Sequence, residues 1–115
     1  MPSRVVHQGD GIAWLRSEQL TSDHALVTSL PDSTELRLPF DEWQTWFSGA
    51  AELMCRVAAP SSVAIFFQTD VKREGAWVDK GFLCQLGGEA AGAQLLWHKI
   101  VCRAPAGTIT FGRPA

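Results

Sequence analysis

The amino-acid sequence predicts an α/β fold in which helices flank a mainly parallel sheet, with residues 1–115 forming a single domain. Apolar segments suited to strands alternate along the chain with segments whose apolar residues recur at helical spacing. Strands separated by helices are usually joined by right-handed crossovers, which make neighbouring strands parallel. The 115 residues are 46% hydrophobic and 19% charged, a composition typical of one globular domain with an adequate core.

The first half of the chain predicts strands at residues 4–7 and 24–29, and helices at residues 11–20 and from Phe40 to before Pro60. Valine-rich alternation indicates the first strand, and the Pro-Asp-Ser sequence that follows the second strand indicates a turn. Trp43, Trp46 and Phe47 share one face of the longer helix, so we expect them to pack in the core.

The second half predicts a strand at residues 61–70, a polar connection at 72–81, a helix at 81–92, a strand at 94–103 and an extended segment at 105–114. The apolar run in the first of these strands is unbroken, which indicates a fully buried strand covered on both faces. Gly87 and Gly88 lie inside the predicted helix, although glycine is a poor helix former. Trp97 ends a predicted strand and is expected in the core.

The sequence excludes several classes of protein. The apolar runs are far shorter than the roughly 18 to 20 residues that cross a bilayer, and no stretch resembles a secretory signal. We therefore expect a cytoplasmic protein. Cys55, Cys84 and Cys102 lie in apolar segments and are expected to be core thiols. His98 and Cys102 are not joined by a Cys-x-x-Cys pair or a second histidine, so no zinc site is expected.

Charge is distributed unevenly, although the net charge is only −2 at pH 7. Residues 1–71 contain four basic and nine acidic residues, a balance of −5, whereas residues 72–115 contain six basic and three acidic residues, a balance of +3. An anionic partner would therefore bind the second half of the chain. A scattered, solvated surface explains the same counts, and both interpretations stay open.

Polar residues follow two of the predicted strands at the ends where a parallel sheet binds ligands. Residues 29–32 follow the strand at 24–29, and Asp70 and Lys72 follow the apolar run of the next strand. Because ligands sit outside the carboxyl ends of parallel strands, we expect both loops at one functional edge. An Asp70–Lys72 surface ion pair is the alternative. The sequence contains no Gly-x-Gly-x-x-Gly or Walker-type loop, so dinucleotide and nucleoside-triphosphate sites have no support.

Residues 23–32 resemble the catalytic motif of methyltransferases that modify exocyclic amino groups in DNA or RNA. In that motif an apolar strand ends in Ser, Asp or Asn, followed by Pro-Pro and an aromatic residue. Gly9-Asp10 resembles an upstream Gly-Asp pair of these families, and "LLWHK" resembles their downstream strand ending in Trp-x-Lys. The chain is more similar still to a group of bacterial proteins described as methyltransferases, through "VTSLPD", "VAIFFQTDVK", "WVDKG", "LLWHK" and "TFGRP". That resemblance covers roughly residues 4–114.

The resemblance implies an incomplete Rossmann-like fold and direct methyl transfer to an amine. An exocyclic amine is a poor nucleophile because its lone pair is delocalised into the ring, and two hydrogen-bond acceptors help it become pyramidal. Carried over to this sequence, the acceptors are the Ser29 side chain and the Leu30 carbonyl, and Pro31 stiffens the turn. Leu30 replaces a proline of the family, and Asp32 stands where an aromatic residue stacks on a flipped-out base. Asp32 could instead accept a hydrogen bond from the substrate.

The resemblance also implies S-adenosylmethionine as the cofactor, but the sequence contains only part of such a site. The glycine-rich loop that holds the amino-acid end of the cofactor is absent, and in permuted relatives it follows the catalytic motif. We therefore expect the chain to be the catalytic-motif half of a longer protein and to bind the cofactor poorly or not at all. Asp10 is the remaining cofactor candidate, since the Gly-Asp pair of relatives lies near the adenosine. A turn residue or helix cap is its alternative.

The candidates for substrate contact are Asp70, Lys72, Trp77, Lys80 and Lys99. Aromatic side chains stack on bases, and basic side chains meet phosphates, so DNA or RNA is the expected partner. Two other functions stay open. The chain could be a non-catalytic Rossmann-like module that binds nucleic acid or a partner subunit, or a homo-oligomer in which a second copy covers an incomplete sheet.

Overall fold

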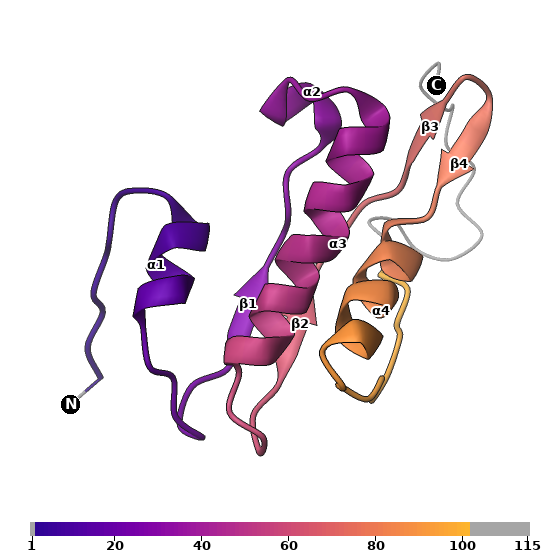
Figure 1. The fold of residues 1–115 in the computed structure, drawn as a ribbon. Coiled ribbons are helices and arrows are strands. Elements are labelled where there is room, and N and C mark those ends of the chain that lie inside the picture. The colour runs from indigo at the N-terminus through magenta and orange to yellow at the C-terminus, as the bar shows by residue number, and fades with distance from the viewer. Residues whose placement is uncertain (1, 102–115) are drawn as a thin grey trace.

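The structure, a computed structural model, describes residues 2–101 and combines helices with short strands (Figure 1). Within these residues the elements follow in the order α1 (Gly11–Ser17), β1 (Leu26–Thr28), α2 (Ser33–Leu36), α3 (Phe40–Val57), β2 (Ala64–Phe66), β3 (Val71–Arg73), β4 (Ala76–Val78) and α4 (Lys80–Ala90). The predicted strand from residue 94 extends past the described part of the chain, and the segment at 105–114 and Cys102 lie outside it.

A pair of parallel strands confirms part of the predicted architecture. β1 and β2 pair in parallel, with Val27 opposite Ile65, and α3 forms the crossover between them. The pair is continued by a hydrogen bond of 2.9 Å from the Phe67 amide to the Thr28 carbonyl. The other sheet of the described residues is an antiparallel pair of β3 and β4. The fold is therefore a mixed α and β arrangement with one parallel and one antiparallel pair.

Helix α3 lies between α1 and α4 and forms the centre of the core (Figure 1). Its apolar residues recur at helical spacing, and the indole of Trp43 and the ring of Phe47 are fully buried with their centroids 5.0 Å apart. Trp46 is partly buried against the same cluster. Asp41 and Glu42 occupy the first turn, where negative charge suits the helix dipole. The predicted packing role of these aromatic residues is confirmed.

Helix α4 packs closely against α3 because glycine lies at their contact. A Cβ atom on Gly87 would stand 2.4 Å from the Ser48 carbonyl oxygen and 2.8 Å from the Glu52 nitrogen. Only a residue without a side chain permits this approach. The helix predicted at residues 81–92 is therefore confirmed, and one of its two glycines is explained by packing.

Several predicted elements are wrong. Residues 4–7 form no strand, and Val5 and Val6 are both exposed, because no neighbouring strand is present to pair with them within the described part of the chain. Residues 94–101 also form no strand, and the prediction that Trp97 lies in the core is wrong because its side chain is exposed. β2 is only half-buried, with Phe67 exposed after it, so the expected burial on both faces is absent.

Residues 72–81 are not a simple polar connection, since they contain most of a β-hairpin. Lys72 lies opposite Trp77, and Arg73 lies opposite Ala76. The two turn residues are Glu74 and Gly75, whose φ angles are +52° and +81°. Two consecutive positive φ values are typical of the tight turns that match the twist of a hairpin. The predicted turn after β1 differs as well, since it leads into the short helix α2.

Among residues 2–101, no helix combines the length and apolarity that crossing a bilayer would require. Cys55 and Cys84 are free thiols that are partly buried in α3 and α4. The prediction that they belong to the core is therefore met in part.

Candidate functional site

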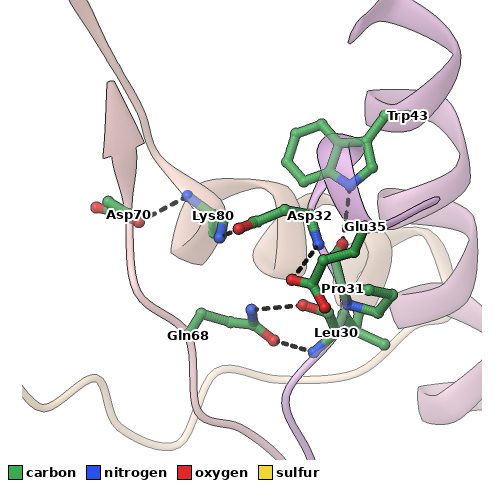
Figure 2. Close-up of polar contacts among 8 residues, drawn as sticks. All are labelled: Leu30, Pro31, Asp32, Glu35, Trp43, Gln68, Asp70 and Lys80. Atoms are coloured by element: carbon green, nitrogen blue, oxygen red, sulfur yellow. Dashed lines mark hydrogen bonds and ion pairs between the residues drawn. The ribbon is translucent and has the colours of Figure 1, made fainter. Parts of the chain in front are cut away.

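The turn at residues 29–32 lies at the carboxyl end of β1, beside the chain that leaves the carboxyl end of β2 (Figure 2). The predicted closeness of the two loops is met in part: Gln68 is hydrogen-bonded to the backbone of Leu30, and Asp70 is linked to the turn through Lys80. Lys72 lies on the β3–β4 hairpin instead. Polar groups from α3 and α4 reach the same turn. The turn is therefore held by contacts from three separate parts of the chain.

Gln68 bonds both polar backbone groups of Leu30. The Leu30 amide donates to Gln68 Oε1 over 2.6 Å, and Gln68 Nε2 donates to the Leu30 carbonyl over 3.2 Å. Only 8% of Leu30 is exposed, so these bonds satisfy groups that water reaches poorly. The Leu30 carbonyl expected to accept from a substrate thus already accepts one hydrogen bond. Its second lone pair is not used by Gln68.

Trp43 fixes the next residue of the turn. Its indole Nε1 donates to the Pro31 carbonyl over 2.9 Å, while the ring is buried in the core. A buried indole needs an acceptor for its N–H, and the turn supplies one. The sequence predicted only a packing role for Trp43. The contact adds a direct connection between the core and the candidate site.

Lys80 joins the turn to α4. Its ammonium group forms an ion pair with Asp32 Oδ1, and only 3% of Lys80 is exposed (Figure 2). Its backbone amide donates to Asp70 Oδ1 over 3.0 Å. Lys80, predicted as a substrate contact, is therefore buried beside Asp32. The Asp70–Lys72 ion pair, the alternative interpretation of these two residues, is absent from the described residues.

Asp32 also begins α2. It is the N-cap residue of that helix, and its amide donates to Glu35 Oε1 over 3.2 Å. Aspartate followed three residues later by glutamate is the sequence pattern of a capping box. The carboxylate predicted to meet a substrate is thus shared between a helix start and a buried lysine. Contacts with α2 and α4 therefore hold the turn at Asp32, its last residue.

Two further candidates lie in simpler surroundings. Ser29 is exposed, and its hydroxyl has no hydrogen-bond partner within residues 2–101. Asp10 caps α1, where its Oδ1 accepts from the Ile12 amide over 2.9 Å. The helix-cap interpretation of Asp10 is confirmed, and one of its carboxylate oxygens is not used by this bond. A single carboxylate does not constitute a complete cofactor site.

The remaining candidates do not join the turn. Lys72 and Trp77 form a pair on the β3–β4 hairpin, with the ammonium nitrogen 5.1 Å from the ring centroid. Lys99 lies in the segment after α4, with its ammonium nitrogen 5.6 Å from the ring centroid of Trp97. Within residues 2–101, neither pair is hydrogen-bonded or ion-paired to the Ser29–Asp32 turn.

Sequence reasoning missed Gln68 altogether. The available signal was a polar, two-ended side chain placed directly after the apolar run of β2, at the edge where ligands bind. In the described part of the chain, no three His, Cys, Asp or Glu side chains gather in the way a metal ion requires. No family model, curated protein or solved structure matches the chain.

Proposed function

We propose that this chain is the amine-positioning, catalytic-motif half of a Rossmann-like methyltransferase that uses S-adenosylmethionine and acts on an exocyclic amino group in nucleic acid. The proposal includes a cytoplasmic location. The observation that carries it is the support of residues 29–32 by the rest of the chain. Within this turn, Leu30 is hydrogen-bonded to Gln68 through both its amide and its carbonyl. Reactive geometry requires such supporting contacts around the groups that touch a substrate.

The position of the turn supports the proposal. It follows β1 at the carboxyl end of a parallel strand pair, where ligands bind in open α/β sheets. Gln68, Trp43 and Lys80 hold it from three directions, while the hydroxyl of Ser29 is accessible. The support is consistent with a site that must hold a small group in one orientation.

The chemistry assigned to the chain is orientation of an amine. Ser29 Oγ accepts one N–H of the amino group, and the second lone pair of the Leu30 carbonyl accepts the other. Two acceptors placed out of the plane of the base draw the N–H bonds out of that plane and return the lone pair to nitrogen. Pro31 restricts the backbone between them and Asp32. In this assignment Asp32 and Lys80 are positioning residues that keep the turn in place.

The methyl donor supplies an electrophilic methyl group when it is bound. Among residues 2–101, Asp10 is the one that would contact the methyl donor. It would do so through the carboxylate oxygen that does not cap α1. We propose that the rest of the cofactor site comes from a glycine-rich segment other than residues 2–101. Binding of S-adenosylmethionine to the 115 residues alone is expected to be weak.

Recognition of the amine tests the proposal without the cofactor. Fluorescence anisotropy would compare a single-stranded oligonucleotide that carries one cytosine with the same strand carrying uracil. The two bases differ chiefly in that an amino group of cytosine is replaced by a carbonyl in uracil. We expect about tenfold tighter binding of the cytosine strand, because two hydrogen bonds of ordinary net strength are gained. Equal affinity for the two strands would overturn the proposal.

A second function is favoured by one observation. The Leu30 carbonyl and the Asp32 carboxylate already have partners inside the protein. A non-catalytic module that binds nucleic acid needs neither group. This candidate predicts salt-sensitive binding with the same affinity for cytosine and uracil strands, and no response to a change at Ser29.

A further inference from the structure

Two exposed tryptophans each lie beside a lysine ammonium group. The Trp77 side chain is 67% exposed, and Trp97 is 54% exposed. The Lys72 nitrogen lies 5.1 Å from the Trp77 ring centroid, and the Lys99 nitrogen lies 5.6 Å from that of Trp97. Both distances are within the range of cation–π attraction. The same combination of an open ring and a cation thus occurs on two separate segments.

Both pairs border the first turn of α4. Trp77 lies in β4, which ends at Val78, two residues before α4 begins. His98 separates Trp97 from Lys99, and a Cβ atom on Gly81 would stand 3.3 Å from His98 Cε1. Figure 1 shows the segment after α4 returning along that helix toward its first turn. The segments that carry the two tryptophans therefore both border the start of α4. We call the exposed side chains of these two pairs, Lys72 with Trp77 and Trp97 with Lys99, the surface.

The hairpin holds the Trp77 part of this surface in place. Lys72 and Trp77 are direct cross-strand partners, and the Arg73 guanidinium carbon lies 4.2 Å from the ring centroid of Phe40 at the start of α3. A groove of about 460 Å³ runs beside the hairpin, and Phe82 of α4 is among its lining residues. Cross-strand pairing and the contact with α3 hold the exposed aromatic group in place.

The charges around the surface favour an anionic ligand. Lys72, Arg73 and Lys99 each lie over an aromatic ring. Of the nearby acids, Glu74 is at the hairpin tip, and the carboxylates of Asp70 and Asp79 accept from the backbone amides of Lys80 and Phe82, each over 3.0 Å. Aromatic faces combined with cations bind polymers whose planar bases alternate with phosphates.

We propose that this surface binds single-stranded nucleic acid, with bases stacked on Trp77 and Trp97 and phosphates paired with Lys72 and Lys99. Paired bases hide their faces within the duplex, so only an unpaired strand can use both rings. The inference rests on the proposed function for its choice of nucleic acid as the polymer. It deepens that function by naming single strands as the substrate class and by assigning a docking surface apart from the Ser29 turn.

Anisotropy with the 115-residue chain and a labelled oligothymidine strand tests this surface. Thymine has no exocyclic amine, so this binding is independent of the site at Ser29. We expect the single strand to bind more tightly than a duplex of the same length. Trp77→Ala and Trp97→Ala should each weaken binding by roughly five- to a hundredfold, the range measured for lost base stacking. Phe67→Ala removes an aromatic residue that is also 54% exposed but follows β2, and should leave affinity unchanged.

Salt dependence tests the lysines. Lys72→Gln and Lys99→Gln should each lower the slope of log affinity against log salt concentration by about 0.7, the value for one phosphate contact on a single strand. Arg16→Gln, an exposed change in α1, should not alter the slope. Thermal melts would verify that all variants remain folded.

The two proposals fail independently. Tight binding of oligothymidine without a cytosine preference supports this surface and overturns amine recognition. The assignment of this surface is overturned if the chain does not bind oligothymidine. It is also overturned if Phe67→Ala loses as much affinity as Trp77→Ala and Trp97→Ala. Light scattering that showed self-association through Trp77 and Trp97 in the absence of oligonucleotide binding would assign the surface to a second copy of the chain.

Discussion

The side chain of Gln68 bonds both the amide and the carbonyl of Leu30, 38 positions away in the sequence. A primary amide can donate and accept at once, so one residue satisfies the whole backbone of another. The contact connects the carboxyl ends of the two parallel strands. It ties the candidate turn to the chain that leaves the neighbouring strand.

Gln68→Leu should destabilise the fold by about 1–3 kcal/mol, because the poorly exposed amide and carbonyl of Leu30 lose their partners. Gln85→Leu is the matched control, since Gln85 bonds only Glu89 on the exposed side of α4. Its effect should stay within about 0.5 kcal/mol. Urea unfolding would measure the change in the free energy of unfolding for both variants. Equal free energies of unfolding for the two variants would show that the Gln68 contact does not support the turn.

Asp32→Asn should lower the free energy of unfolding by about 3–5 kcal/mol, because it leaves the buried ammonium of Lys80 without its carboxylate partner. Asparagine is a good N-cap, so α2 keeps its helix start. Lys80→Met in the Asp32→Asn background removes the buried charge and should recover most of the lost stability. The native chain, Asp32→Asn, Lys80→Met alone and the double variant form a double-mutant cycle, measured by thermal or urea unfolding. A double variant as unstable as Asp32→Asn would contradict the assigned ion pair.

Gly87→Ala and Gly88→Ala should change stability in opposite directions. A Cβ at residue 87 meets backbone atoms of α3 at 2.4 and 2.8 Å, and backbone cannot move aside cheaply, so a loss of about 1–3 kcal/mol is expected. A Cβ at residue 88 meets its nearest atom, Cys55 Sγ, at 3.7 Å. There the better helix propensity of alanine should add up to about 1 kcal/mol. Similar melting temperatures for the two variants would refute the close packing of α3 and α4.

The Cys84 thiol should make stability fall in alkaline solution. Burial raises its pKa to about 12, with Cys55 and Asp79 adding to the effect and Lys80 opposing it. The unfolded thiol ionises near its ordinary pKa of 9.0, so above that pH the unfolded chain loses a proton that the folded chain keeps. The contribution of the protonated Cys84 thiol to the free energy of unfolding is therefore complete below pH 9.0 and is lost as pH rises toward about 12.

Urea midpoints of the native chain should therefore fall between about pH 7.5 and about pH 9.5. Cys84→Ala should show a smaller fall over the same interval. An identical pH dependence in the two proteins would mean that this thiol ionises equally in the folded and unfolded states.

The elements that the sequence predicted correctly are those decided by local patterns. Helix α3 follows from the spacing of its apolar residues, and β1 and β2 follow from short apolar runs next to turn residues. The hairpin was missed because Glu-Gly at its tip is a weaker turn signal than Asn-Gly. Residues 4–7 and 94–101 have strand-like composition but no partner strand in the described structure, and pairing is a tertiary property.

The site was predicted in position but not in detail. The turn could be located because a polar cluster ended an apolar strand. The burial of Lys80 could not be predicted, since lysine is almost always exposed and its partner Asp32 is 48 residues away. The cap formed by Asp10 involves a residue only two positions away, and local contacts of this kind can be read from sequence.

The assignment of residues 29–32 as the amine-positioning turn is tested by the affinities of the native chain and of Ser29→Ala for the cytosine and uracil strands. We expect the cytosine preference of the native chain to fall toward equality in Ser29→Ala, because one of the two amine acceptors is lost. Ser61→Ala, an exposed serine before β2, should retain the preference. An undiminished cytosine preference in Ser29→Ala would contradict the assignment of this turn as the amine-positioning site.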